Sequence, residues 1–194
     1  VVVACMEPRS AVVEFEEKAG RYTVHMGCQG TFGMRKQLAA LLNVEPAKVR
    51  VLTKNVGGSF GMKSFAYPEY ICLLHAAKML GRPIKWTDER SSSFLSDQQG
   101  RDHDVEGELA LDKDGNFLAV RLSLFSNMGG YLAAVGPNMA TNNMVKNITS
   151  VYKTPAIEIN TKCVFTNTTP ISAYRGAGRP EANYYMERLI AVSY

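Results

Sequence analysis

Glycine is concentrated in the stretch 56–61 (VGGSFG), which follows a segment, 48–52, with the polar and apolar alternation of a strand. Glycines after a strand let main-chain N–H groups approach an anionic or oxo-rich ligand, because no side chain stands in the way. The glycine order does not match the dinucleotide-binding pattern, and Lys63 and Ser64 lack the first glycine of a phosphate-binding P-loop. The residues of this glycine loop therefore leave two interpretations open, an ordinary turn and a ligand cradle.

A second candidate, the arginine loop 173–181, places two arginines among small residues immediately before Pro180, where a helix is expected to start. Main-chain N–H groups at a helix start, with a guanidinium nearby, can hold an anion or a polar ligand. The alternative is structural, because the first arginine, Arg175, can pair with a carboxylate such as Glu181 or Glu187.

The histidines and cysteines form no recognisable site. No histidine has a neighbouring nucleophile or metal-ligand set, so each is interpreted as a surface residue or a hydrogen-bonded core residue: His25, His75 and His103. The cysteines lack the CxxC or Cys/His spacing that suits zinc or an iron–sulfur cluster, so any cluster must lie on another chain. Disulfides are one alternative, but a reduced setting and a role as small buried apolar residues is the plainer interpretation for Cys5, Cys28, Cys72 and Cys163.

Strand and helix patterns alternate along the chain before and after the glycine loop. A strand pair around a turn at 18–20 opens the fold, with Val12 in its first strand and 21–26 as its second. Thr31 is a suitable helix N-cap and precedes apolar residues at helical spacing that end near Asn43. After the loop, a helix over 70–80 is closed by Gly81-Arg82-Pro83, and a short strand follows at 84–86.

The second half begins with the clearest element, a hairpin of strands 105–111 and 117–125 around an Asp-Gly turn. Small residues, Met and Asn blur the pattern over 129–149, and no element is placed there. A strand over 157–165 and the helix that begins at Pro180 complete an α+β domain without internal repeats. A soft boundary is expected near 96–101.

Composition limits the function classes. The chain has 194 residues, of which 46% are hydrophobic, enough for one sizeable domain or two small subdomains. The net charge of +4 is spread without a Lys/Arg run, so no nucleic-acid partner is expected. No apolar stretch is long enough for a membrane span. The abrupt start at Val1 and the lack of a helix stop signal before Tyr194 predict a piece of a longer polypeptide.

Three motifs favour a ligand site over the structural alternatives: Gln29 within 27–31 (GCQGT), 56–63 (VGGSFGMK) and 173–180 (AYRGAGRP). In order and approximate spacing they resemble the large subunits of molybdenum hydroxylases, the family of xanthine dehydrogenase, aldehyde oxidase and aerobic carbon monoxide dehydrogenase. The opening 6–9 (MEPR) is similar as well, so the resemblance spans essentially the whole chain. It implies the α+β fold of that family's first molybdenum-cofactor-binding domain, with mixed sheets and packed helices, and makes the chain part of a longer molybdopterin-binding region.

The resemblance also implies a chemistry. In this family a molybdenum-pterin cofactor hydroxylates a substrate C–H bond with oxygen from water, and electrons leave through 2Fe–2S clusters to FAD. The clusters and the flavin are expected on partner subunits or domains, a 2Fe–2S small subunit and a FAD-binding medium subunit. A cytosine dinucleotide form of the cofactor and a cytoplasmic dimer of heterotrimers are implied as well.

The same resemblance assigns the site residues. Gln29 matches a glutamine whose amide reaches an oxo ligand of molybdenum, as a neutral donor that stabilises charge without transferring a proton. Arg175 matches an arginine that borders the same centre, and with Gln29 it is an expected catalytic residue. The main chain that faces the cofactor is expected from Gly58, Ser59, Phe60 and Gly61, and from Gly176 and Ala177. No residue is expected to ligate the metal, and the family's general-base glutamate has no counterpart in this chain.

Departures from the family pattern narrow the substrate. Ser64, Asn143 and Ala177 stand where xanthine-oxidising relatives have a glutamate, an arginine and a stacking aromatic residue, which disfavours purines. Gly176 stands where carbon monoxide dehydrogenases have the cysteine that holds copper. The resemblance therefore implies an aldehyde or an N-heteroaromatic substrate.

Two other function classes are weighed against this one. A non-catalytic assembly domain or degenerate paralogue is disfavoured by the presence of Gln29 and Arg175, and a phosphate- or nucleotide-binding module by the missing motif. The isolated chain is expected to be inactive, free of cofactor and prone to self-association through exposed apolar patches. The central prediction is spatial: Gln29, the glycine loop and the arginine loop converge on one cavity.

Overall fold

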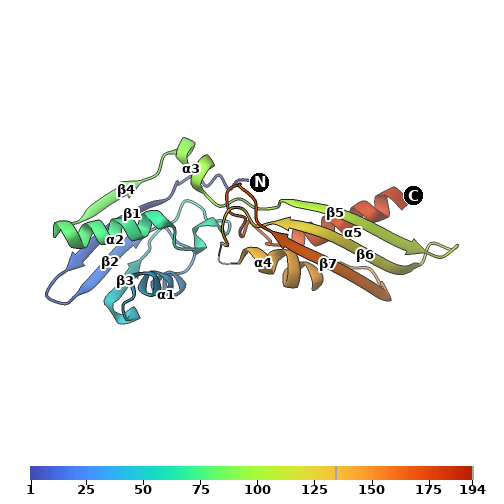
Figure 1. Ribbon diagram of the computed structural model, residues 1–194, viewed down its shortest axis with the longest axis horizontal. Coiled ribbons are helices and arrows are strands. Elements are labelled where there is room, and N and C mark those ends of the chain that lie inside the picture. The colour runs from blue at the N-terminus through green and yellow to red at the C-terminus, as the bar shows by residue number, and fades with distance from the viewer. Residues whose placement is uncertain (134, 194) are drawn as a thin grey trace. The chain divides into compact units, whose positions relative to one another are not determined.

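The protein is described by a computed structural model of residues 1–133 and 135–193, which divides into two compact units. The N-terminal unit is Val3–Asp97, and the C-terminal unit combines Val1–Val2 with Gln98–Tyr194. The division lies inside the stretch where the sequence suggests a soft boundary. Each unit contains its own sheet (Figure 1).

The sheet of the N-terminal unit has the strand order β3-β2-β1-β4, with β1 (Ser10–Glu16), β2 (Arg21–Met26), β3 (Val49–Leu52) and β4 (Ile84–Thr87). β1 pairs antiparallel with β2 and β4, whereas β2 and β3 run parallel. The predicted strand pair around 18–20 and both short strands are confirmed. Val13 and Val24 lie opposite each other and are fully buried, so this face of the sheet carries the core.

The helices of this unit are α1 (Thr31–Leu42), α2 (Pro68–Leu80) and α3 (Arg90–Ser96), with short 3-10 turns η1 (Pro46–Lys48) and η2 (Met62–Ser64). α2 packs on β1 and α1 on β3, burying Leu74 and Leu38 completely. Both helices end as predicted, in the left-handed residues Gly81 and Asn43.

The start of α1 differs from its prediction. Thr31 was expected to be the N-cap, but it is the first helical residue, and Gly30 occupies the cap position with a φ of 149°. Glycine adopts this conformation more readily than threonine because it has no Cβ. The chain therefore turns into α1 through main-chain geometry, without a side-chain cap.

The C-terminal unit has a three-stranded sheet and one long helix: β5 (His103–Leu111), β6 (Phe117–Asn127), β7 (Ala156–Val164) and α5 (Arg179–Ser193). β5 and β6 form the predicted hairpin, and the turn between them is held by Asp112, which accepts hydrogen bonds from Asp114 and Asn116. β7 runs parallel to β6. The predicted terminal helix is confirmed, while its continuation to Tyr194 lies outside the described residues.

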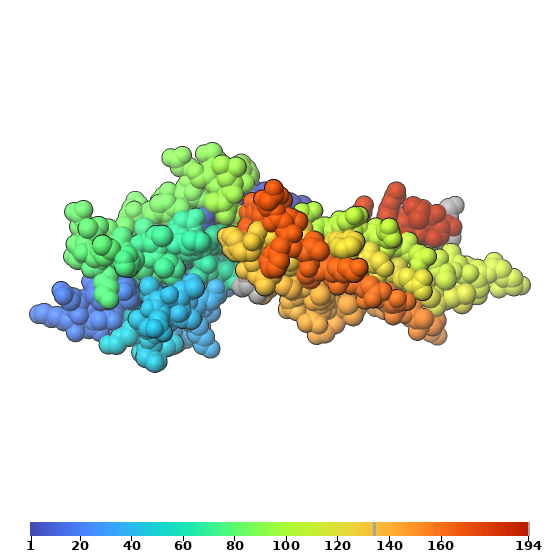
Figure 2. All heavy atoms as spheres, in the orientation of Figure 1, coloured from blue at the N-terminus to red at the C-terminus, as the bar shows by residue number. Residues whose placement is uncertain are grey.

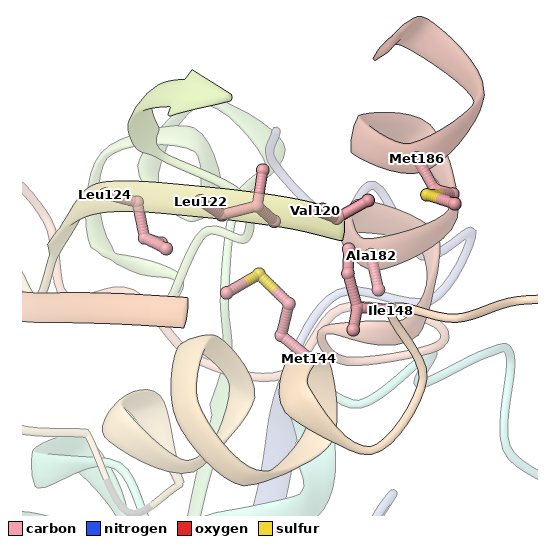
Figure 3. Close-up of a cluster of buried hydrophobic side chains, with 7 residues drawn as sticks. All are labelled: Val120, Leu122, Leu124, Met144, Ile148, Ala182 and Met186. Carbon is pink, nitrogen blue, oxygen red and sulfur yellow. The ribbon is translucent and has the colours of Figure 1, made fainter. Parts of the chain in front are cut away.

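The core of this unit lies on one face of β6. It contains seven buried side chains from β6, from the segment after residue 143 and from α5: Val120, Leu122, Leu124, Met144, Ile148, Ala182 and Met186 (Figure 3). The opposite face of the sheet is exposed, and its yellow-green, yellow and orange strands form surface in Figure 2. Arg121 on that face pairs with Glu108 and Glu158, all of them exposed.

The stretch 129–149, where the sequence placed no element, contains α4 (Gly136–Asn138) and a π-helical turn, η3 (Met139–Asn143). Small residues and asparagines have weak helix propensity, so local pattern gives no signal here. The helical turns instead form where Met144 and Ile148 are buried against β6.

Two mixed sheets with packed helices confirm the predicted α+β class. In the part of the chain that the structure describes, no helix is both long and apolar enough to cross a membrane.

Candidate functional site

Gln29 lies in the loop between β2 and α1, and it is bonded to the glycine loop. Its main-chain N–H donates to the carbonyl of Lys63 at 3.1 Å. Its side-chain oxygen, Oε1, accepts hydrogen bonds from the Ser59 hydroxyl at 2.5 Å and from the Gly61 N–H at 2.9 Å. Two of the three predicted segments therefore meet in the N-terminal unit.

These bonds fix which end of the Gln29 carboxamide faces the protein. A main-chain N–H can only donate, so the Gln29 atom that faces Gly61 must be the oxygen. The exposed side chain then turns its Nε2 group away from the loop, and this NH2 makes no hydrogen bond within residues 1–133 and 135–193. The site thus offers two uncharged N–H donors to a ligand.

The glycine loop has a main-chain shape that few side chains tolerate. Gly58, Phe60 and Gly61 have φ angles of 98°, 51° and 105°, all in the left-handed region. A Cβ at Gly57 would lie 2.4 Å from the Cβ of Glu7, so only glycine fits at this position. The side chain of Phe60 is 44% exposed, which leaves an aromatic ring at the rim of the loop.

Glu7 ties the two ends of the glycine loop together. Its Oε2 accepts from the Gly57 N–H at 2.9 Å and from the Lys63 ammonium at 2.7 Å. Its main-chain N–H donates to the Gly57 carbonyl at 3.1 Å. The hydrogen bond from Lys63 holds the pKa of Glu7 below its usual value, so the carboxylate stays ionised.

Arg9, two residues further on, anchors this segment to the rest of the unit. Its guanidinium is fully buried, binds Asp97 through Nε at 2.5 Å, and forms a bidentate pair with Glu69 at 2.9 and 3.0 Å. The same group lies 3.9 Å from the centre of the Tyr67 ring. The strand entry that carries Glu7 is therefore fixed by a charged network.

The arginine loop lies in the C-terminal unit and is held by Arg101. The Arg101 guanidinium donates to the Arg175 carbonyl at 2.5 Å, lies 4.6 Å from the Tyr174 ring centre, and pairs with Glu181 at 3.4 Å. Glu181 also accepts from the Gly178 N–H at 3.0 Å. Glu181, which the sequence offered as a partner for Arg175, thus binds Arg101 and the main chain of the loop, and the Arg175 residue is exposed.

The turn after Arg175 has three consecutive left-handed residues: Gly176, Ala177 and Gly178, with φ of 92°, 46° and 95°. A Cβ at Gly178 would lie 2.3 Å from the carbonyl oxygen of Met139, so the loop presses directly on η3. Asn143, at the end of η3, donates its side-chain N–H to the Ala177 carbonyl at 2.9 Å. The π-helical turn therefore supports the arginine loop, in keeping with the frequent place of such turns at functional sites.

The structure thus brings Gln29 together with Gly58, Ser59, Phe60 and Gly61 in one unit, and places Arg175, Gly176 and Ala177 in a single turn of the other. Convergence of the three segments on one cavity, and the role of each residue toward a cofactor, stay predictions.

Four polar residues that hold these loops were not predicted as part of the site: Glu7, Lys63, Arg101 and Asn143. Glu7 and Lys63 belong to the motifs 6–9 and 56–63, so the sequence indicated that they lie near the site. It did not indicate that they form an ion pair. Arg101 had no signal, since its partners are more than seventy positions away.

The histidines behave as interpreted. His25 and His75 are exposed, and His103 is hydrogen-bonded through Nδ1 to the Tyr185 hydroxyl at 2.8 Å. Among the described residues, no group of three or more His, Cys, Asp and Glu side chains is arranged to hold a metal ion.

The four cysteines are free, but only two are buried. Cys5 and Cys28 fit their interpretation as small apolar core residues. For Cys72 and Cys163 that interpretation is wrong, because both are exposed. Cys72 lies in α2 and Cys163 in β7, on faces that the core does not cover.

Comparison with known proteins shows which family the chain belongs to. The molybdopterin cofactor-binding domain family matches residues 1–192. The chain is 35% identical over 190 residues to the gamma subunit of the 6-hydroxypseudooxynicotine dehydrogenase complex of Paenarthrobacter nicotinovorans, covering 95% of this chain and 23% of that protein. It is 31% identical over 189 residues to the carbon monoxide dehydrogenase large chain of Hydrogenophaga pseudoflava, covering 96% and 24%.

The fold agrees with solved structures. Quinoline 2-oxidoreductase from Pseudomonas putida 86 superposes with a TM-score of 0.94 at 29% identity, over 100% of this chain and 25% of that one. The chain thus spans about a quarter of the length of the relatives it matches. The family match, the sequence identities and the superposed fold lead to one conclusion: the chain belongs to the molybdopterin cofactor-binding domain family of molybdenum hydroxylase large subunits.

Proposed function

We propose that this chain is part of the large subunit of a molybdenum hydroxylase that oxidises an aldehyde or an N-heteroaromatic compound, with water as the oxygen source. The observation that carries the proposal is the Gln29 carboxamide, whose oxygen is held by the glycine loop while its NH2 group is exposed. Fixed, uncharged N–H donors stabilise negative charge on an oxo-rich group without adding a competing proton donor.

The loops fit a molybdenum-pterin cofactor. In the glycine loop, Gly58, Phe60 and Gly61 have left-handed conformations, a main-chain shape that can turn N–H groups toward an anionic group. Gln29 would donate to an oxo ligand, and the main chain around Phe60 would lie against it. We propose a role in binding the same group for Arg175 and the turn that follows it. When bound, the cofactor supplies the oxidation of the substrate C–H bond, while these residues orient it and stabilise charge.

Three residues support a non-purine substrate. Asn143 is neutral, and its side-chain N–H is already used by the Ala177 carbonyl, so it supplies no cation for a purine anion. Ala177 has no ring to stack on a substrate, and Ser64 has no carboxylate. Two of the similar proteins have names that refer to 6-hydroxypseudooxynicotine and to quinoline, and the latter is an N-heteroaromatic compound.

Copper is not part of the proposal. Gly176 stands where the copper-binding cysteine of carbon monoxide dehydrogenases is expected, and without a thiolate a Cu(I) ion lacks its preferred soft ligand. The similarity to a carbon monoxide dehydrogenase large chain is therefore interpreted as common descent and not as a common substrate.

The proposal extends to the rest of the enzyme. A FAD-binding medium subunit and a 2Fe–2S small subunit would carry electrons away, in a cytoplasmic dimer of heterotrimers with the cytosine dinucleotide form of the cofactor. Support comes from the similar gamma subunit, whose name assigns it to a complex. A non-catalytic assembly domain is the second candidate, and the exposed Gln29 NH2 group argues against it.

Elemental analysis and turnover assays of the purified complex test the proposal. We expect stoichiometric molybdenum, no copper, and turnover of at least one member of a panel of aldehydes and N-heteroaromatics. Copper together with oxidation of carbon monoxide would overturn the substrate assignment. A folded complex without molybdenum would favour the non-catalytic alternative.

A further inference from the structure

We propose that Lys63 and Glu7 are positioning residues whose partly buried ion pair holds the glycine loop so that Gln29 presents its NH2 group outward. This inference rests on the proposed function, because it concerns how the amide is presented to the cofactor. The Glu7 carboxylate binds the Gly57 N–H and the Lys63 ammonium, so both residues act through the loop.

Lys63 controls both the main chain and the side chain of Gln29. Its carbonyl accepts the Gln29 main-chain N–H at 3.1 Å, and its own N–H donates to the Ser59 hydroxyl oxygen at 3.1 Å. The Ser59 hydroxyl donates a hydrogen bond to Gln29 Oε1 at 2.5 Å. The three residues form a closed ring of hydrogen bonds, so a shift of Lys63 moves the carboxamide.

Glu7 fixes where that ring lies. A single oxygen, Oε2, accepts from the Gly57 N–H at one end of the loop and from the Lys63 ammonium just past the other end. The Glu7 main chain adds a bond to the Gly57 carbonyl, and the Gly57 position has no room for a Cβ. The Glu7 carboxylate therefore links the two ends of the glycine loop and sets the distance between them.

Stability alone does not explain this pair. The Lys63 side chain is only 1% exposed, and the Glu7 side chain is 36% exposed. Burying an ammonium group costs free energy that one partly hydrated carboxylate recovers poorly, and apolar residues of similar volume are often at least as stable in such places. An apolar residue, however, has no donor for Oε2 and would leave the loop ends untied.

The hydrogen bonds to the Gln29 side-chain oxygen also support a positioning role for the ion pair. Its oxygen already receives two hydrogen bonds, which is enough to orient an amide only if both donors are themselves fixed. The Gly61 donor is fixed by the main chain, whereas the Ser59 hydroxyl can rotate unless Lys63 donates to it. The ion pair is thus the element that makes the second donor rigid.

The test uses the purified complex that contains this chain, with Lys63→Met and the matched control Lys36→Met. Lys36 is exposed on α1, so its loss removes the same charge without touching the loop. For Lys63→Met we expect a lower Tm, because Glu7 loses its charged partner, with an unchanged KM and a kcat lower by about 10- to 100-fold, the usual effect of losing an outer-shell support. The electron paramagnetic resonance spectrum of the reduced molybdenum centre should shift, whereas Lys36→Met should match the wild type throughout.

A second variant keeps the inference testable if Lys63→Met does not fold. Ser59→Ala removes the hydroxyl that joins Lys63 to Gln29 but leaves the Lys63–Glu7 ion pair in place. It should show the same spectral shift with a smaller loss of kcat. Either variant, folded and loaded with molybdenum but with wild-type kcat and spectrum, would overturn the inference. A wild-type complex without molybdenum would instead overturn the proposed function, and that result is read before any variant is made.

Discussion

Gln29 is the residue on which the cofactor assignment depends, and an isosteric change can test it. In Gln29→Glu a carboxylate oxygen still accepts from Ser59 and Gly61, but the outward NH2 is replaced by a second negative oxygen. We expect kcat to fall by about 100-fold or more, the typical effect of removing a donor to developing charge. The unfolding midpoint in urea should stay close to that of the wild type, and unchanged turnover would contradict the assigned role.

Gly178 gives a prediction for the arginine loop. An alanine there would adopt an unfavourable φ of 95° and place its Cβ 2.3 Å from the Met139 carbonyl oxygen. Gly115 has a similar φ of 83° but open space around it, so Gly115→Ala is the matched control for strain alone. Urea denaturation should show a cost of about 1–2 kcal/mol for the control and about 3 kcal/mol or more for Gly178→Ala. Equal costs would mean that the contact with η3 yields easily.

At the scale of residues, the sequence motifs predicted the residues of the loops themselves but not the polar residues that hold the loops in place. Gln29 and the glycine loop were predicted to meet, and they do, through bonds across 30 and 32 positions. The Lys63–Glu7 pair spans 56 positions, and nothing in the spacing of the two residues encodes that approach. The sequence indicates only that Asn143 carries no charge. Its hydrogen bond to Ala177 depends on a π-helical turn that no local sequence pattern predicts.

At the scale of elements, the sequence correctly predicted those turns and helix ends whose conformation depends on the residues within them. The Asp-Gly turn specified the β5–β6 hairpin, and Gly81 ended α2, because turn and cap conformations depend on the residue in place. Prediction failed over 129–149, where helical turns owe their existence to the burial of Met144 and Ile148 against a distant strand. It also erred at the start of α1, where the conformation of Gly30 outweighs the capping preference of Thr31.

The contact between β5 and α5 predicts a pH dependence. His103 is bonded to Tyr185, and burial lowers the pKa of His103 while it raises the pKa of Tyr185 to about 12. The folded state therefore binds a proton on His103 less readily than the unfolded state, in which the pKa is near 6.5. Stability from the neutral imidazole is present above that value and is lost as the pH falls below it.

Thermal unfolding between pH 7.5 and 5 checks this dependence. The Tm of the wild type should fall over this interval more than that of His103→Gln, which keeps a hydrogen-bonding side chain but has no proton to gain. His75→Gln is the control, because His75 is exposed. Parallel curves for all three proteins would show that His103 is as accessible to protons when folded as when unfolded.

At the scale of the whole molecule, the chain has two compact units and spans about a quarter of the length of its relatives. Its relatives are about four times longer, and the general base expected in the family has no counterpart here. We expect the isolated chain to contain no molybdenum by elemental analysis and to show no turnover. Stoichiometric metal in the isolated chain would contradict this prediction.

Exposed apolar side chains give the same isolated chain a second property. Met6 is 95% exposed, Val151 88% and Leu95 80%, and several other large apolar residues are exposed to lesser degrees. Burial of such surface is favourable, so sedimentation velocity should show association that grows with concentration. A monomer at high concentration would count against it.

The first residues of the chain belong to the unit that the last residues build. Val2 pairs with Gln99, and the Gly100 N–H donates to the Val1 carbonyl at 2.8 Å, so the chain leaves and re-enters the C-terminal unit at neighbouring points. Val3–Asp97 is therefore topologically an insert with adjoining ends. We expect that replacing it with the same segment of a relative would leave the chain path of the C-terminal unit unchanged, so Gln29 could be varied together with its whole sheet while Arg175 stays in place.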